Sequence, residues 1–114
     1  MTASEVYKPP FHHDGTMIWS ANNVMAVMAA DCHQHPDKLI ERTCQILNGE
    51  VKSNGNPQIT YVNGEIFNGP QLLLVIRGFG YLTGSGGLNL PLETAIKIQD
   101  EFGEWVCRKL RNQE

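Results

Sequence analysis

The stretch QLLLVIRGFGYLTGSGG, residues 71–87, decides the fold. Its five consecutive aliphatic residues, Leu72–Ile76, are typical of a strand that is buried on both faces. Glycines then recur at positions 78, 80, 84, 86 and 87, where they let the main chain turn or approach another group closely. A helical pattern begins near Pro91. We therefore expect the central strand at 72–77, followed by a glycine-rich functional surface.

Turn residues predict the elements upstream of this stretch. Residues 16–29 (TMIWSANNVMAVMA) are compatible with a hairpin that turns at Asn22-Asn23, and also with a helix. We favour the hairpin, because asparagine tolerates the positive φ of a tight turn. A helix is predicted from Pro36 to about Asn48, since proline suits the first helical turn and Gly49 supplies a stop.

Turn residues and periodicity also predict the elements on either side of the central strand. The segment ITYVNGEIF, residues 59–67, is the strongest hairpin signal in the chain, because Asn63-Gly64 matches a type I′ turn. A further short strand is expected at about 79–83, after a bend at Gly78. The last helix is predicted from about 91 to 111, with a wide apolar face.

The predicted elements follow one another in the order ββα-βββα. This order indicates an α+β fold, a two-layer sandwich in which two helices cover one face of an antiparallel or mixed sheet of about five or six strands. Residues 14–114 are expected to form this single domain. Residues 1–13 lack periodicity, so we expect a flexible N-terminal arm whose Tyr7 and Phe11 dock on the domain or on a neighbouring subunit.

The composition disfavours one class of partner and favours another. The 114 residues carry a net charge of −3, which disfavours nucleic-acid binding because that needs a basic face. The basic residues Arg108, Lys109 and Arg111 cluster at the end of the last helix, where cations complement the helix dipole; contact with a phosphate is the alternative. Charged residues make up only 18% of the chain, so we expect a homodimer that covers part of the neutral surface.

The cysteines and the apolar runs indicate a compartment. Cys32, Cys44 and Cys107 are odd in number and widely spaced, as is typical of reduced thiols inside the cell. The first ten residues lack the apolar core of a signal peptide. No apolar run approaches the ~20 residues of a membrane span. We therefore expect a cytoplasmic protein without membrane contact.

One part of the chain resembles a known group of proteins. The run MIWSANNVMAVMA, followed by PDKLIERTCQILNG, is similar to a pattern in small accessory proteins of phages and mobile gene cassettes. In that pattern two strands joined by an Asn/Asp/Gly turn lead into a helix that ends in a Leu-Asn pair. The resemblance covers roughly residues 16–49 and includes no chemically specific residue. It implies a fold and a mobile-element context without implying an activity, because most of those proteins have none assigned.

The glycine-rich segment is the first candidate for a functional surface. Arg77 ends the central strand, and Phe79 and Tyr81 flank Gly80 where a pocket mouth or an interface is expected. The spacing GxGxxxG departs from the dinucleotide fingerprint and no Lys-Ser/Thr pair follows, so we expect no cofactor; nucleotide binding at 78–87 is the weaker alternative. Pairing of Arg77 with an internal acid is the structural alternative. The predicted ligand- or partner-binding residues are Arg77, Phe79, Tyr81, Gly84, Ser85 and Gly86.

The histidines form the second candidate. All four lie in two clusters, one before and one after the hairpin predicted at 16–29, and a hairpin with equal arms would bring the clusters together. Imidazole and thiolate groups suit zinc or nickel, whereas ordinary solvated loop histidines are the alternative. The candidate metal ligands are His12, His13, Cys32, His33 and His35.

These observations together predict a small non-enzymatic interaction or ligand-binding module, because no catalytic residue set can be identified. The binding partner is expected to be a protein or a small molecule. The alternative is a metal-binding protein, or a small metal-dependent enzyme, that uses the two histidine clusters.

Overall fold

The computed structural model describes residues 1–31, 34–53 and 55–111. The described residues form six strands and four helices. The helices are α1 (Ala3–Val6), α2 (Pro36–Leu47), α3 (Phe79–Thr83) and α4 (Leu92–Leu110). The strands are β1 (His12–Asp14), β2 (Met17–Trp19), β3 (Met25–Ala29), β4 (Ile59–Val62), β5 (Glu65–Asn68) and β6 (Gln71–Ile76).

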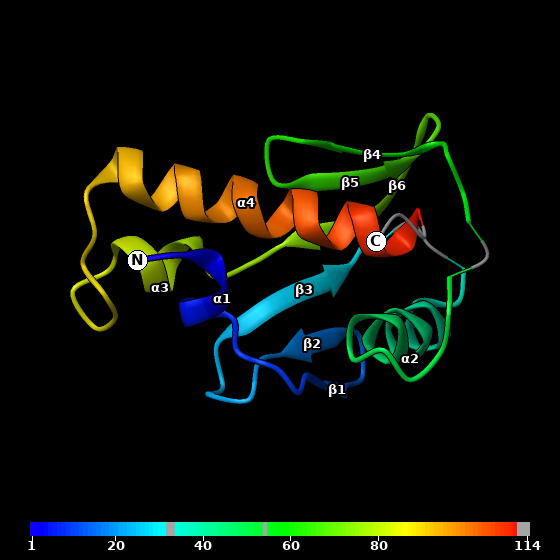
Figure 1. The fold of residues 1–114 in the computed structure, drawn as a ribbon, viewed down its shortest axis with the longest axis horizontal. Coiled ribbons are helices and arrows are strands. Elements are labelled where there is room, and N and C mark those ends of the chain that lie inside the picture. Colours follow the sequence, from blue (N-terminus) through cyan, green and yellow to red (C-terminus); the bar gives the residue numbers. More distant parts are fainter. Residues whose placement is uncertain (32–33, 54, 112–114) are drawn as a thin grey trace.

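The strands form one antiparallel sheet in the order β1-β2-β3-β6-β5-β4. α2 contacts β1, β2 and β3, α4 contacts β4 and β5, and the two helices contact each other, so both cover the same face. Figure 1 shows α4 running along the length of the molecule, with α2 beside its C-terminal end. The predicted α+β sandwich is confirmed. The described residues add two short helices, α1 and α3, to the two that were predicted.

The sheet has a repeated plan. In each half a three-stranded meander leads into a long helix: β1 to β3 precede α2, and β4 to β6 precede α3 and α4. The last strands of the two halves, β3 and β6, pair at the centre of the sheet. The aliphatic run Leu72–Ile76 therefore occupies a central strand, as the sequence predicts.

Two predicted turns are present. Asn63 and Gly64 join β4 to β5 with φ angles of 47° and 85°, and two positive φ angles are what a type I′ turn requires. Residues 16–29 adopt the favoured hairpin, in which β2 pairs with β3 and Asn23 has a φ of 62°. The Ser20 hydroxyl oxygen accepts a 3.0 Å hydrogen bond from the Val24 amide and so holds this turn closed.

The core lies between the sheet and the two long helices. The fully buried strand residues on this side include Ile18, Val27, Ile66 and Leu74. α4 approaches the sheet closely at Gly103, where an added Cβ would lie 2.2 Å from Cε1 of Tyr61. The Tyr61 hydroxyl donates a 2.7 Å hydrogen bond to Oδ1 of Asp100. Burial, together with this hydrogen bond, raises the pKa of Tyr61.

The N-terminal segment differs from the flexible arm expected for residues 1–13. α1 contacts α4, and Val6, Tyr7 and Phe11 are only 2%, 2% and 5% exposed. The Glu5 carboxylate supports the short helix, because it accepts a hydrogen bond from the Thr2 amide. The segment therefore belongs to the folded domain, and its burial depends on contacts with the far end of the chain that local sequence does not reveal.

The strand expected at 79–83 is the helix α3 instead. Gly78 adopts a φ of 103°, which turns the chain out of β6 at a position that favours glycine. The amides of Leu82 and Gly84 then donate helical hydrogen bonds to the carbonyls of Gly78 and Gly80. Leu82 is fully buried by this turn, so tertiary packing outweighs the strand tendency of the aromatic residues.

The face of the sheet opposite α2 and α4 differs from the expectation that β6 is buried on both sides. Leu72 and Val75 of β6 are only half-buried, whereas Leu74 and Ile76 beneath the helices are buried. The described helices that contact strands, α2 and α4, both lie on the other side. We call this second side the open sheet face. Its apolar residues include Met17, Trp19, Met28, Phe67 and Val75.

None of the helices formed by the described residues is both long and apolar enough to cross a bilayer.

Candidate ligand-binding cleft

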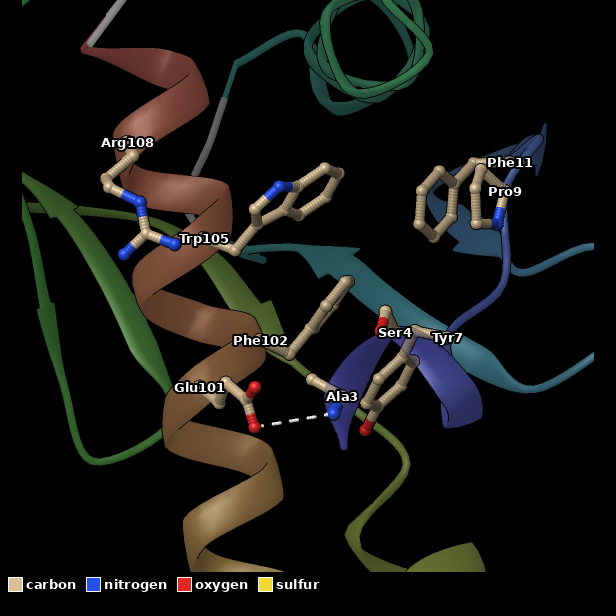
Figure 2. A pocket seen from close by; sticks show the side chains of 9 residues that line it. All are labelled: Ala3, Ser4, Tyr7, Pro9, Phe11, Glu101, Phe102, Trp105 and Arg108. Carbon is tan, nitrogen blue, oxygen red and sulfur yellow. Dashed lines mark hydrogen bonds between the residues drawn. The ribbon is translucent and has the colours of Figure 1, made fainter. Parts of the chain in front are cut away.

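A pocket of about 210 Å³ lies between the N-terminal segment and α4. Figure 2 shows α1 and the chain that follows it on one side, and α4 on the other. We call this pocket the aromatic cleft. It is lined by Ala3, Ser4, Tyr7, Pro9, Phe11, Glu101, Phe102, Trp105 and Arg108.

Four aromatic rings in mutual contact dominate the lining. Tyr7 stacks on Phe102, with the ring centroids 4.1 Å apart and the planes at 15°. The ring centroids of Phe102 and Trp105 are 5.9 Å apart, and so are those of Trp105 and Phe11. Rings at these separations attract one another, so the wall is preformed and the cleft does not need to be built by a ligand.

The two walls are positioned by different means. Phe102 and Trp105 are three residues apart on α4, a spacing that places both on one side of a helix. Tyr7 is fixed by its hydroxyl, which donates a 2.8 Å hydrogen bond to the carbonyl of Arg77 at the end of β6. Burial raises the pKa of the Tyr7 hydroxyl, so this donor keeps its proton throughout the neutral range.

Phe11 is held by Asn48, the residue that caps the C-terminal end of α2. Oδ1 of Asn48 accepts a hydrogen bond from the Phe11 amide, and Nδ2 of Asn48 donates one to the Phe11 carbonyl, each at 2.7 Å. A side-chain amide that satisfies both main-chain groups of one residue imitates the pairing of two strands. Asn48 therefore fixes the second wall of the aromatic cleft to the domain.

Charged groups mark the two ends of the aromatic cleft. Oε2 of Glu101 accepts a 3.4 Å hydrogen bond from the Ala3 amide at one end. Arg108, seven residues further along α4 and thus about 10 Å away along the helix axis, marks the other end (Figure 2). Within the described chain, Arg108 has neither an ion pair nor a hydrogen-bonded partner. Nζ of Lys109 lies 5.7 Å from the centroid of the Trp105 ring, in a cation–π contact.

The lining groups suit binding better than bond breaking. Aromatic rings offer flat apolar surfaces, and a free guanidinium offers two parallel donors for a carboxylate or phosphate. The described residues that line the aromatic cleft include no His, Cys or Lys, and Glu101 is the one carboxylate among them.

The residues predicted from the glycine-rich segment lie at a different place. Arg77 and Phe79 line a smaller pocket of about 190 Å³ where β6 passes into α3. Arg77 is exposed, and Phe79 packs against the core with part of its surface accessible. This pocket adjoins the aromatic cleft, because the Tyr7 hydroxyl bonds to the Arg77 carbonyl.

The other predicted residues do not line that smaller pocket. Tyr81 is 38% exposed on α3, and Gly87 lies against it so closely that an added Cβ would be 2.1 Å from the Tyr81 carbonyl oxygen. Gly84 ends α3, and Ser85 and Gly86 are exposed in the loop that follows. A ligand- or partner-binding role for these residues stays a prediction.

The candidate metal ligands are only partly described. His12 and His13 are neighbours on β1, so their side chains point to opposite faces of the sheet. His35 immediately precedes α2, whereas Cys32 and His33 lie outside the described residues. Among the described residues, no three His, Cys, Asp or Glu side chains are grouped so that they could hold a metal ion. A metal site completed by Cys32 or His33 stays a prediction.

Comparison of this chain with protein families, with curated proteins and with solved structures finds no match.

The aromatic cleft was not predicted from the sequence. Its lining comes from residues 3–11 and 101–108, near the two ends of the chain, and no local spacing connects them. The sequence does predict that Tyr7 and Phe11 dock somewhere, and that a helix carries Phe102 and Trp105 on an apolar face. The sequence predicts a flexible arm at residues 1–13, whereas the cleft exists because this segment is packed against α4.

Proposed function

We propose that this protein is a non-enzymatic binding module whose aromatic cleft takes a small planar ligand with an acidic group. The observation that carries the proposal is one pocket lined by four aromatic rings in contact and by Arg108, whose guanidinium has no partner among the described residues. The rings supply apolar stacking surface. Arg108 supplies the charge that selects an anion.

The size of the aromatic cleft sets the size of the ligand. A cavity of about 150 Å³ accommodates benzene in a protein interior. The aromatic cleft, at about 210 Å³, is larger and open to solvent on one side. One or two fused rings therefore fit, whereas a dinucleotide would not.

The position of Arg108 favours a carboxylate or phosphate at one end of the ligand. It follows Trp105 by three residues on α4 and lines the same pocket, so a ring stacked on Trp105 can direct an acidic substituent toward the guanidinium. At the other end, the Glu101 carboxylate would repel an acid. This arrangement predicts the orientation of the ligand along α4.

Naphthoate is a suitable probe, since it combines two fused rings with one carboxylate. Trp19 is replaced by Phe, so that Trp105 becomes the single fluorescent tryptophan of the chain. We expect a saturable change of Trp105 fluorescence on titration with naphthoate. Naphthol, which has the same rings without the charge, should bind more weakly. Absence of saturable binding of both probes at millimolar concentration would contradict the proposal.

The role of Arg108 has a matched control. Arg108→Gln should weaken naphthoate binding by about 5–10-fold, the effect of losing a charge-assisted hydrogen bond at a solvent-accessible site, and should leave naphthol binding unchanged. Arg42→Gln removes another exposed arginine, on α2, whose guanidinium donates a hydrogen bond to the Lys52 carbonyl; Arg42 does not line the aromatic cleft. It should leave both affinities unchanged. Equal loss of naphthoate binding in the two variants would mean that Arg108 acts only through net charge.

The mobile-element context implied by residues 16–49 stays a prediction beside this proposal. So does the alternative function in metal binding. Each is independent of the aromatic cleft and is tested separately, the second by the metal content of the purified protein and of a His33→Ala/His35→Ala variant.

A further inference from the structure

We infer that the open sheet face packs against the same face of a second copy of this chain, giving a homodimer in which two sheets lie face to face. The interface assigned here involves neither the aromatic cleft nor the β6–α3 corner. It is independent of the proposed ligand.

The register of the strands defines the centre of this face. Residues that lie directly opposite each other on neighbouring strands point to the same side of the sheet. Following these pairs from strand to strand therefore gives one row of side chains across the whole sheet. This row runs Asp14, Met17, Met28, Val75, Glu65 and Val62, from β1 to β4. Its middle is apolar, and its charged members lie toward the two edges.

Large apolar side chains flank this row. Trp19 lies two residues from Met17 on β2, and Phe67 lies two residues from Glu65 on β5, so both point to the open sheet face. Both are only half-buried in the single chain, and Val62 is 53% exposed. A continuous apolar surface of this kind marks an interaction site in a soluble protein.

The sequence of β6 provides an independent indication. Antiparallel strands with one face in water normally alternate apolar and polar residues, whereas Leu72–Ile76 is aliphatic throughout. Among the described residues, the helices that contact the neighbouring strands, α2 and α4, lie on one side of the sheet. A second copy that covers the other side of β6 would explain why the residues there are apolar as well.

A dimer would use the whole of the open sheet face. The six strands are three to six residues long and about 4.8 Å apart, so the sheet measures roughly 25 Å by 14 Å, or about 350 Å² before side-chain relief and the flanking turns are counted. Specific interfaces begin at about 600 Å² per partner. A partner therefore has to cover the sheet from edge to edge and reach the flanking turns, which a second sheet can do and a short peptide cannot.

The chemistry of the face favours a second copy. An apolar centre is complementary to itself, and methionine side chains adjust readily to an opposing surface. The strand residues assigned to this face include no Lys or Arg, so it does not suit an anionic membrane or a nucleic acid. Face-to-face sheets cross at about 30°, which covers the central strands most and leaves Asp14 and Glu65 nearer the rim.

The mass of the protein in solution tests the inference. Sedimentation equilibrium of the wild type over a micromolar concentration series should give a dimer. Met28→Lys and Val75→Lys each place two charges in the middle of a symmetric interface and should give monomers, with dimer dissociation constants at least 100-fold higher. Ile96→Lys is the matched control, because it replaces a 43% exposed aliphatic residue of α4 by the same charge. It should remain a dimer.

A measurement on the wild type guards against variants that fail to fold. The methyl groups of Met17 and Met28 should be shielded from a soluble paramagnetic probe at high protein concentration and become accessible on dilution. The Met1 methyl group, whose residue is 63% exposed, should be accessible throughout. A monomeric wild type, a dimer that survives Met28→Lys, or Met17 and Met28 methyl groups that stay accessible at high concentration would each overturn the inference.

Discussion

The hydroxyl of Tyr7 and the carbonyl oxygen of Arg77 are joined by a 2.8 Å hydrogen bond across 70 residues of sequence. Gly78, the next residue, leaves the room that this bond needs, since an added Cβ there would lie 2.6 Å from the Tyr7 hydroxyl oxygen. One glycine and one phenol thus attach the N-terminal segment to the end of the central strand. The wall of the aromatic cleft depends on that attachment.

Tyr7→Phe removes this bond and retains the stacked ring. We expect the free energy of unfolding to fall by about 1 kcal/mol, because the Arg77 carbonyl loses a partner in a site that water reaches poorly. Urea unfolding followed by circular dichroism measures the change. Tyr81→Phe removes an exposed hydroxyl and should change stability by less than about 0.5 kcal/mol. Equal stability of the wild type and Tyr7→Phe would show that the bond contributes nothing.

Asn48→Ala should release the segment around Phe11. Two hydrogen bonds to the main chain of a buried residue are lost together, so we expect a loss of about 1–3 kcal/mol in the free energy of unfolding. Chymotrypsin should then cut after Tyr7 or Phe11 under conditions where the wild type resists. Lys38→Ala, at an exposed position of the same helix, serves as the control. Unaltered digestion of Asn48→Ala would mean that the ring contacts alone hold the segment.

Gly103→Ala should destabilise the protein although alanine is the better helix former. The added methyl group would lie 2.2 Å from the Tyr61 ring, and such overpacking costs about 1–3 kcal/mol, against a gain of up to about 1 kcal/mol in helix propensity. In a Tyr61→Ala background the obstruction is absent, so the same change should become stabilising. Thermal unfolding of the four proteins completes the cycle. The same sign in both backgrounds would disprove the close contact as the cause.

Stability should decrease as the pH rises above about 9. Burial raises the pKa of the Cys107 thiol from 9.0 to about 11, so over that range the unfolded chain loses a proton that the folded protein keeps. The unfolded state then binds fewer protons, and the free energy of unfolding falls with increasing pH. Cys107→Ala should show a shallower fall between pH 9 and 10 than the wild type, because the other groups whose pKa burial raises, Cys44, Tyr7 and Tyr61, contribute to both proteins alike. Parallel slopes for the two proteins would assign the effect to other groups.

Local signals predicted much of the fold. The Asn63-Gly64 turn, the aliphatic run of β6 and the proline that opens α2 each act within a few residues, and each is present in the structure. β1 was not predicted, because its sequence, His12–Asp14, has none of the residues that strands prefer. Its pairing with β2 depends on the turn at 15–16 and on an available strand edge.

Long-range contacts account for what could not be predicted. The helical turn of α3 buries Leu82 in the core, although Phe79 and Tyr81 are aromatic residues that favour strands. The aromatic cleft joins residues whose proximity arises only when α1 meets α4. From the sequence, Arg108 is predicted only to complement the dipole of its own helix. Its place beside Trp105, at the mouth of a pocket, follows from tertiary structure alone.

The contact of α1 with α4 also constrains how the protein is made. The Ala3 amide and its partner Glu101 are 98 residues apart, so α1 cannot dock until α4 has been synthesised. At about 5–20 residues per second this interval lasts about 5–20 s. During it the rings of Tyr7 and Phe11 lack their partners on α4, Phe102 and Trp105. The nascent chain therefore exposes a short hydrophobic segment that a chaperone can hold until α4 is made.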